Sequence, residues 1–104
     1  MTEFEITQVS PERYRLSGEL DMATAETLRD ALEPVVQANG RLVLDVGEIT
    51  FIDSSGLRAL LQISQQMNGA APLVLSQVPP SVRRLLDVVG LEAVPGIEVE
   101  DDGQ

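Results

Sequence analysis

The feature that most constrains the fold is a nearly unbroken apolar run, Leu-Val-Leu-Asp-Val, at residues 42–46. An aliphatic run without alternation indicates a strand covered on both faces, and such strands occur in parallel sheets flanked by helices. Apolar residues at helical spacing lie on both sides of this run, from Met22 to Val36 and from Leu57 to Met67. Strands that alternate with helices in this way predict an α/β protein with right-handed crossovers.

The remaining strands are predicted near the two ends of the chain. Alternating apolar residues at 4–9 and 13–17 flank the turn residues Ser10-Pro11-Glu12, which predicts an antiparallel hairpin. Further along, residues 73–75 form a short buried strand, and residues 97–99 are a candidate for a last edge strand. The expected fold is therefore a mixed, mostly parallel sheet of four to five strands, opened by an antiparallel hairpin, with helices packed on it.

The helix boundaries follow from capping and breaking residues. The first helix is expected to begin near Asp21, an acceptable N-cap, and a third helix should open at Pro79-Pro80-Ser81. Pro34 lies late in the first helix, where an interior proline costs about 3 kcal/mol, so a kink or a break is expected there. The length of 104 residues fits one compact domain. We assign it to residues 1–99, followed by an acidic, frayed tail at 100–104.

The composition excludes most routes to catalysis. The chain has no cysteine and no histidine, and all seven of its basic residues are arginine. Disulfides, thiolate metal sites, serine–histidine triads and catalytic lysines are therefore ruled out. We expect a protein that is not an enzyme, with no catalytic residue, no cofactor and no metal ion.

The charge of the chain limits its partners. Seventeen acidic and seven basic residues give a formal net charge of −10 and a pI near 4.1. Such a field repels phosphate backbones and anionic lipid, and it favours encounters with basic protein surfaces. The first residues, MTEFEITQV, do not resemble a signal peptide, and no apolar run approaches the length of a membrane span. We therefore expect a cytoplasmic, bacterial-style protein with no nucleic-acid or membrane partner.

The most informative segment is VGEITFIDSSGLRALL at residues 46–61. An apolar stretch leads into the turn Asp53-Ser54-Ser55-Gly56, and an amphipathic helix follows. The ordinary interpretation is an N-cap, whose side chains satisfy free backbone N–H groups. The functional interpretation is that one hydroxyl is modified or binds an anion at the partly positive helix end, beside a glycine that lets another surface approach closely. The residues alone leave both interpretations open.

Four stretches of the chain, taken in order, resemble the STAS-domain anti-sigma factor antagonists. The turn at residues 53–57 resembles the Asp-Ser-Ser/Thr-Gly-Leu motif that carries the phosphorylated serine of that family. LSGELD at 16–21, followed by AETL at 25–28, resembles the family's G-E-L-D entry to its first helix. LVLD at 42–45 resembles its central strand, and PSVRRLLD at 80–87 its last well-formed helix. The likeness extends over nearly the whole chain, which makes it more specific than any single motif.

The resemblance implies a STAS-like fold and a regulatory binding protein. By position, Ser54 is the phosphorylated serine, and Ser55 is the adjacent, usually unmodified hydroxyl. The unphosphorylated protein is expected to bind an anti-sigma factor that is itself an ATP-dependent serine kinase, which releases a sigma factor. Phosphorylation of Ser54 abolishes this binding, and a separate phosphoserine phosphatase restores it. The implied partner-binding residues are Gly18, Glu19, Leu20, Asp21, Asp53, Ser55, Gly56, Leu57 and Arg58.

Arg58 departs from the family's pattern, which often has glycine at that position. The arginine is either a plain solvent-facing side chain, a partner for a phosphate on Ser54 four residues earlier, or a selector of a different binding partner. We expect such a phosphate to stabilise the helix that it begins, and to act through charge and bulk rather than by unfolding. The alternative functions are a STAS adaptor subunit of a transporter or lipid-trafficking complex, and a binder of a small anionic ligand, which the net charge disfavours.

Overall fold

The computed structural model describes residues 4–39, 41–67, 72–89 and 96–100. Its strands and helices follow one another in the predicted order: strand, strand, helix, strand, helix, strand, helix, strand. In chain order they are β1 (Glu5–Ser10), β2 (Arg13–Leu20), α1 (Met22–Asn39), β3 (Leu42–Ile52), α2 (Ser54–Gln66), β4 (Leu73–Ser76), α3 (Pro80–Val89) and β5 (Ile97–Val99). The α/β class predicted from the sequence is therefore confirmed.

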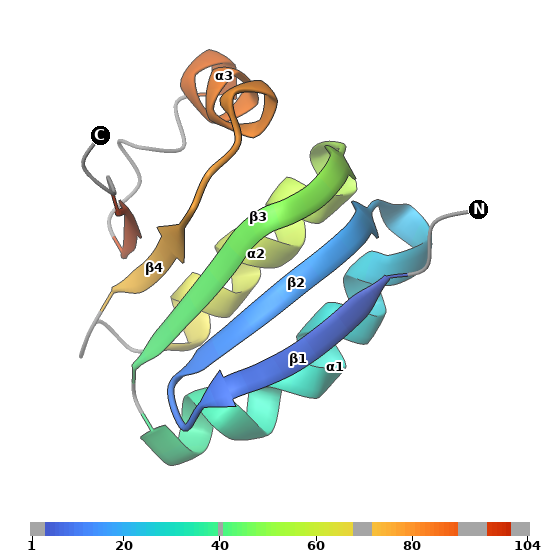
Figure 1. Cartoon of the computed structure of the whole chain (residues 1–104). Helices are drawn as coiled ribbons and strands as arrows, with labels where there is room; N and C mark the ends of the chain where they lie inside the picture. The colour runs from blue at the N-terminus through green and yellow to red at the C-terminus, as the bar shows by residue number, and fades with distance from the viewer. Residues whose placement is uncertain (1–3, 40, 68–71, 90–95, 101–104) are drawn as a thin grey trace.

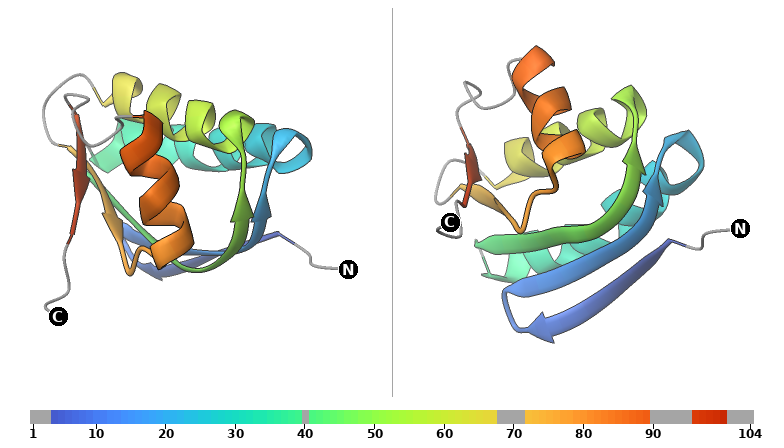
Figure 2. Two further views of the ribbon diagram at one scale, coloured as in Figure 1. Left: turned by 90° about the horizontal axis from the view of Figure 1, so that it is seen from above. Right: turned by 45° about the horizontal axis from the view of Figure 1, so that its top comes forward.

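The strands of the described residues form a five-stranded sheet in the order β1-β2-β3-β4-β5. β1 and β2 make the antiparallel hairpin, and every later pair of neighbours is parallel. Figures 1 and 2 show α1 and α2 side by side on one face of the sheet, with α3 apart from α1 and near β4. The mixed, mostly parallel sheet opened by a hairpin is thus confirmed, with the larger of the two predicted strand numbers.

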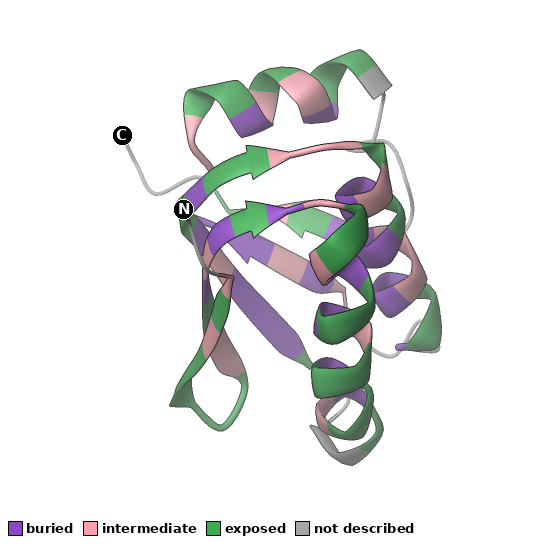
Figure 3. Ribbon diagram, turned by 90° about the vertical axis from the view of Figure 1, so that its right-hand side faces the viewer, coloured by how far each residue is buried: buried purple, intermediate pink, exposed green. Residues whose placement is uncertain are grey.

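The apolar run at 42–46 forms the first half of β3, at the centre of the sheet between β2 and β4. All of its residues are buried except the half-buried Asp45. Leu44 is fully buried and belongs to the same core as Leu28 of α1 and Leu60 of α2. Figure 3 shows the buried sides of the helices turned toward the sheet. This core is the main source of stability, since each fully buried aliphatic side chain contributes about 1.5–3 kcal/mol relative to an exposed one.

β3 is longer than the sequence predicted. We expected a strand at 42–46 and then a separate approach to the turn, but β3 continues to Ile52 because β2 pairs with it as far as Leu20. The register between these strands shifts twice, and the second shift lies between Gly18 and Glu19. Gly18 has a φ of 98°, in the left-handed region that favours glycine. The second half of β3 is mostly exposed and leads directly to the start of α2.

α1 is one continuous helix from Met22 to Asn39, with Pro34 inside it. Of the two alternatives expected at Pro34, a kink or a break, the break is therefore wrong. Pro34 is exposed, whereas Leu32 and Val36 on either side of it are buried in the core. Packing of the apolar face on both sides of the proline holds the helix together, because tertiary contacts commonly outweigh local propensity.

The C-terminal end of the described chain extends the sheet. β5 pairs in parallel with β4, which confirms the predicted edge strand. The Glu100 N–H donates a hydrogen bond of 2.8 Å to the Leu75 carbonyl. The rest of the acidic tail predicted at 100–104 lies outside the described residues. Within the described ranges, no helix is both long enough and apolar enough to cross a membrane.

Replacing Pro34 by alanine should stabilise the protein. Alanine restores a backbone N–H donor and removes the clash of the proline ring with the preceding turn, so the free energy of unfolding should rise by about 1–3 kcal/mol. Urea unfolding followed by circular dichroism measures this change. Glu33→Ala, at the exposed neighbouring position, is the control and should stay within about 0.5 kcal/mol of the wild type. A Pro34→Ala variant less stable than the wild type would contradict this account of α1.

Candidate functional site

Asp53 builds the turn between β3 and α2. Its carboxylate accepts hydrogen bonds from the backbone N–H groups of Ser55 and Gly56, at 2.9 and 3.1 Å. The N–H of Asp53 itself donates to the Leu20 carbonyl at 3.3 Å. Three of the four N–H groups at the start of the helix are thereby satisfied. The capping interpretation of this turn is confirmed for Asp53.

Gly56 sets the start of α2 directly against the end of β2. A Cβ atom at this position would lie 2.5 Å from the Leu20 carbonyl oxygen and 2.9 Å from Cγ1 of Ile52. Both distances are far inside van der Waals contact, so a residue with a side chain cannot be placed there without moving the backbone. The sequence analysis expected the glycine to admit another surface. The surface that approaches it is the chain's own β2, because Gly56 and Leu20 are both buried.

The Ser54 hydroxyl takes no part in the cap. Ser54 is the first residue of α2 and is exposed, and its hydroxyl forms no hydrogen bond with any described residue. Ser55 is half-buried and contributes its backbone N–H to the Asp53 carboxylate. Capping therefore accounts for Asp53 and leaves Ser54 as an accessible hydroxyl at the N-terminus of a helix.

A second capped turn lies at the end of β2. The Asp21 carboxylate accepts hydrogen bonds from the N–H groups of Ala23 and Thr24, at 3.0 and 3.2 Å, so Asp21 caps α1 as predicted. The Thr24 hydroxyl donates to the Glu19 carbonyl at 2.8 Å. β2 and β3 are parallel neighbours, with Glu19 opposite Phe51, so both capped helix starts lie at the same edge of the sheet. The structure thus brings together the two turns that the sequence analysis selected.

The residues predicted to bind a partner differ in burial. Exposed are Glu19 and Arg58, and half-buried are Asp21, Asp53 and Ser55. Buried are Gly18, Leu20, Gly56 and Leu57. The four buried residues pack inside the two turns. Only the exposed and half-buried side chains of this set, together with Ser54, are accessible to a partner.

Two exposed apolar side chains at these turns were missed by the sequence analysis. Phe51, near the end of β3, is 49% exposed, and Met22, the first residue of α1, is 78% exposed. Large apolar side chains exposed beside polar groups are typical of protein–protein contact sites. The sequence indicated these two residues only through their positions. Met22 directly follows one capping aspartate, and Phe51 lies two residues before the other.

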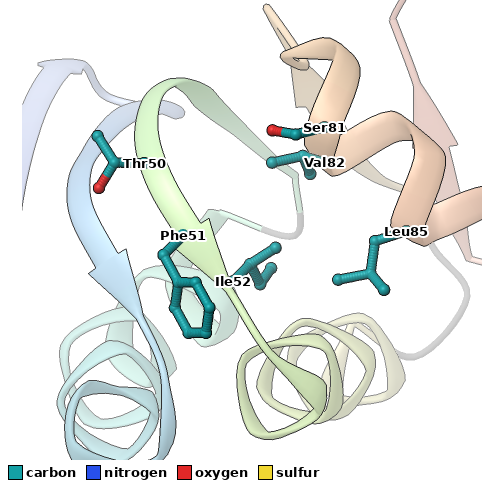
Figure 4. Close-up of a pocket in the computed structure, with 6 residues that line it drawn as sticks. All are labelled: Thr50, Phe51, Ile52, Ser81, Val82 and Leu85. Atoms are coloured by element: carbon teal, nitrogen blue, oxygen red, sulfur yellow. The ribbon is translucent and has the colours of Figure 1, made fainter.

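A hollow of about 130 Å³ lies between the end of β3 and α3. It is lined by Thr50, Phe51, Ile52, Ser81, Val82 and Leu85. Figure 4 shows Ile52 pointing toward Leu85, whereas the Phe51 ring points away from α3. The lining includes hydroxyl groups but no charged side chain, so this hollow offers an anionic ligand no counter-charge.

The chain belongs to the STAS domain family, whose model matches residues 6–102. It is 36% identical over 80 residues to an anti-sigma F factor antagonist of Paenibacillus polymyxa, and the alignment covers 74% of this chain and 68% of that protein. The family resemblance carried by the four sequence motifs is therefore confirmed.

Solved structures share the fold. The crystal structure of an anti-sigma factor antagonist from Mycobacterium paratuberculosis gives a TM-score of 0.77 at 24% identity, covering 94% of this chain and 86% of that one. The Bacillus protein SpoIIAA gives TM-scores of 0.68 in its unphosphorylated form and 0.66 in its phosphorylated form, at 20% and 21% identity. These two alignments cover 95% and 96% of this chain, and 88% and 93% of the SpoIIAA chains. The STAS-like fold is confirmed by all three structures.

Replacing Gly56 by alanine should destabilise the protein. The new Cβ would meet the Leu20 carbonyl, which belongs to the backbone and cannot turn aside, so the loss should reach or exceed the roughly 1–3 kcal/mol typical of overpacking. Thermal unfolding measures the change. Ser55→Ala, at the preceding position of the same helix, is the control and should have a smaller effect. Equal stability of the two variants would contradict the close contact between α2 and β2.

Replacing Asp53 by alanine should remove the cap of α2. The N–H groups of Ser55 and Gly56 would lose their acceptor, at a cost of about 0.5–2 kcal/mol. Asp53→Asn keeps an oxygen acceptor and should remain close to the wild type, since asparagine is an equally good N-cap. Chemical denaturation compares the two variants, and an equal loss in both would show that the cap does not depend on the side-chain oxygen.

Proposed function

We propose that this protein is an anti-sigma factor antagonist switched by phosphorylation of Ser54. Its unphosphorylated form binds an anti-sigma factor that is a serine kinase, and a sigma factor is thereby released. The observation that carries the proposal is the exposed Ser54 hydroxyl, which lies at the start of α2 and is not used by the cap. The likeness to proteins named anti-sigma factor antagonists supports it independently.

The proposed docking surface consists of the accessible side chains at the two capped turns. Its polar members are Glu19, Asp21, Asp53, Ser54, Ser55 and Arg58. Its apolar members are Met22 and Phe51, which supply the buried contact area that polar groups alone would not. Gly18, Leu20, Gly56 and Leu57 belong to the same proposal as the buried residues that shape this surface.

Phosphorylation would change the charge of the docking surface. The kinase transfers the γ-phosphoryl group of ATP to the Ser54 oxygen, which loses its proton, and ADP leaves. The product carries about −1.5 to −2 additional charges directly beside the Asp53 carboxylate. A partner that covers this turn must desolvate the new charge, at a cost of several kcal/mol unless it supplies a cation. Because about 1.4 kcal/mol corresponds to a tenfold change in affinity, this penalty is sufficient to separate the complex.

The Asp53 cap determines whether the new charge interacts with the start of α2 or with solvent and a partner. The Asp53 carboxylate already accepts the N–H groups of Ser55 and Gly56, which are the donors that a phosphate at a helix start would otherwise use. A phosphate on Ser54 therefore gains less from the helix end than the sequence analysis expected. It remains directed toward solvent and toward any partner, and the fold has no reason to change. SpoIIAA, which shares the fold, has been solved in both its unphosphorylated and its phosphorylated form.

The same proposal assigns the chemistry to other proteins. The chain lacks histidine, cysteine and lysine, so it acts as the substrate of the kinase and of a separate phosphoserine phosphatase, and not as an enzyme. Because those partners act on cytoplasmic transcription factors, the proposed location is the cytoplasm. The adaptor alternative requires neither an accessible hydroxyl nor a phosphate.

Incubation with a candidate anti-sigma factor kinase and ATP should place one phosphate on Ser54, as mapped by mass spectrometry. Titration calorimetry with that kinase should give at least tenfold weaker binding for the phosphorylated protein, because of the buried charge. Ser54→Ala should keep its affinity in the presence of ATP. Ser81→Ala, which removes an exposed hydroxyl of α3 outside the docking surface, is the matched control and should be phosphorylated and released like the wild type.

Two results would overturn this proposal. Phosphate found only on another residue would remove Ser54 as the switch. Equal affinity of the phosphorylated and unphosphorylated proteins for the kinase would remove the charge mechanism and favour an adaptor.

A further inference from the structure

We infer that the groove between α1 and α2 receives an acidic side chain of the partner protein, held between Arg29 and Arg58. This inference rests on the proposed function, since the partner is the anti-sigma factor that binds the docking surface. It goes further by naming the chemistry that selects that partner and by giving Arg58 a role in recognition.

The groove lies beside Ser54 and has a volume of about 330 Å³. α1 contributes Met22, Ala25 and Arg29, and α2 contributes Ser55, Arg58 and Gln62. Figures 1 and 2 show these two helices side by side on the same face of the sheet. The groove therefore shares Met22, Ser55 and Arg58 with the docking surface, and a partner seated on that surface reaches it directly.

The groove collects positive charge in a chain that is otherwise strongly acidic. The formal net charge is −10, and only seven residues are basic. Arg15 and Arg41 pair with the carboxylates of Asp45 and Glu12. Arg29 and Arg58, by contrast, form no ion pair with any described residue, although both line the same groove. Two arginines that line one cavity and form no ion pair with a described residue are complementary to a carboxylate, which a guanidinium group binds through paired N–H donors.

Gln62 of α2 also lines the groove. Its Oε1 atom is buried and has no partner among the described residues. Because this atom has almost no accessible surface, a bound partner does not reach it, and the recognition of the occupant rests on the two arginines.

The exposed Met22 side chain indicates a second property of the bound partner segment, an apolar residue. Its side chain is 78% exposed at the mouth of the groove, and methionine adapts readily to the shape of an apolar partner. The occupant is therefore a segment of the anti-sigma factor that carries an Asp or Glu next to an apolar residue. A phosphate on Ser54, four residues before Arg58 on the same helix, would compete for the Arg58 guanidinium and so weaken the hold on this carboxylate.

The test is the affinity of the charge-reversal variants Arg29→Glu and Arg58→Glu for the kinase that phosphorylates Ser54. Each should bind at least tenfold more weakly than the wild type, and the difference should shrink at high salt. Arg84→Glu is the matched control. It reverses the charge of an exposed arginine of α3 that forms no ion pair with a described residue, and it should change the affinity less than threefold.

Two further measurements complete the test. Arg58→Lys keeps the charge without the paired donors and should lie between the wild type and Arg58→Glu. Reversing the responsible acidic residue of the kinase to arginine should restore binding to Arg58→Glu. Circular dichroism melting verifies that every variant is folded.

The outcomes that would contradict this inference differ from those that would contradict the proposed function. If the wild type binds and Ser54 is phosphorylated, but both arginine variants bind like Arg84→Glu, the groove is not the recognition site. Saturable binding of inorganic phosphate that depends on Arg58 would replace the acidic segment by a small anion. No binding of the wild type to any candidate kinase would instead overturn the proposed function itself.

Discussion

The close contact between Gly56 and Leu20 is the constraint on which the site depends. The start of α2 rests on the last carbonyl of β2, and the same carbonyl accepts the N–H of Asp53. The turn that carries Ser54 and the turn that carries Asp21 are therefore packed against each other, although more than thirty residues of the chain separate them. The parallel pairing of β2 and β3 brings both helix starts to one edge, and the missing side chain of Gly56 lets them lie in contact.

The different roles of the neighbouring residues Asp53 and Ser54 follow from that geometry. The Asp53 carboxylate caps the helix, so the Ser54 hydroxyl is left accessible for the phosphorylation that we propose. In a helix that relied on the serine hydroxyl as its cap, phosphorylation would replace the capping acceptor by a phosphate and so change the cap itself. Here the capping carboxylate and the proposed phosphorylation site occupy adjacent positions, and the cap does not use the serine hydroxyl.

Periodicity and turn residues predicted the order of all the elements, the hairpin and both capping aspartates, because these depend on local sequence. The length of β3 and the continuity of α1 through Pro34 were not predictable, since both depend on pairing and packing with distant residues. The same holds for the site. Ser54 follows from a motif, but the groove that brings Arg29 near Arg58 exists only where two helices pack, and the exposure of Met22 and Phe51 depends on which face the sheet covers.

The capping arrangement at Asp53 also has a consequence for timing. If the two forms of Ser54 differ little in folding free energy, neither is removed faster than the other by unfolding and proteolysis. The phosphate ester is then made or broken only when an enzyme acts on it, so each form persists until that happens. The ratio of the two forms would then record only the relative rates of the kinase and the phosphatase over the recent past. A domain built in this way serves as a passive memory of opposing enzyme activities, whose retention time is set outside the protein.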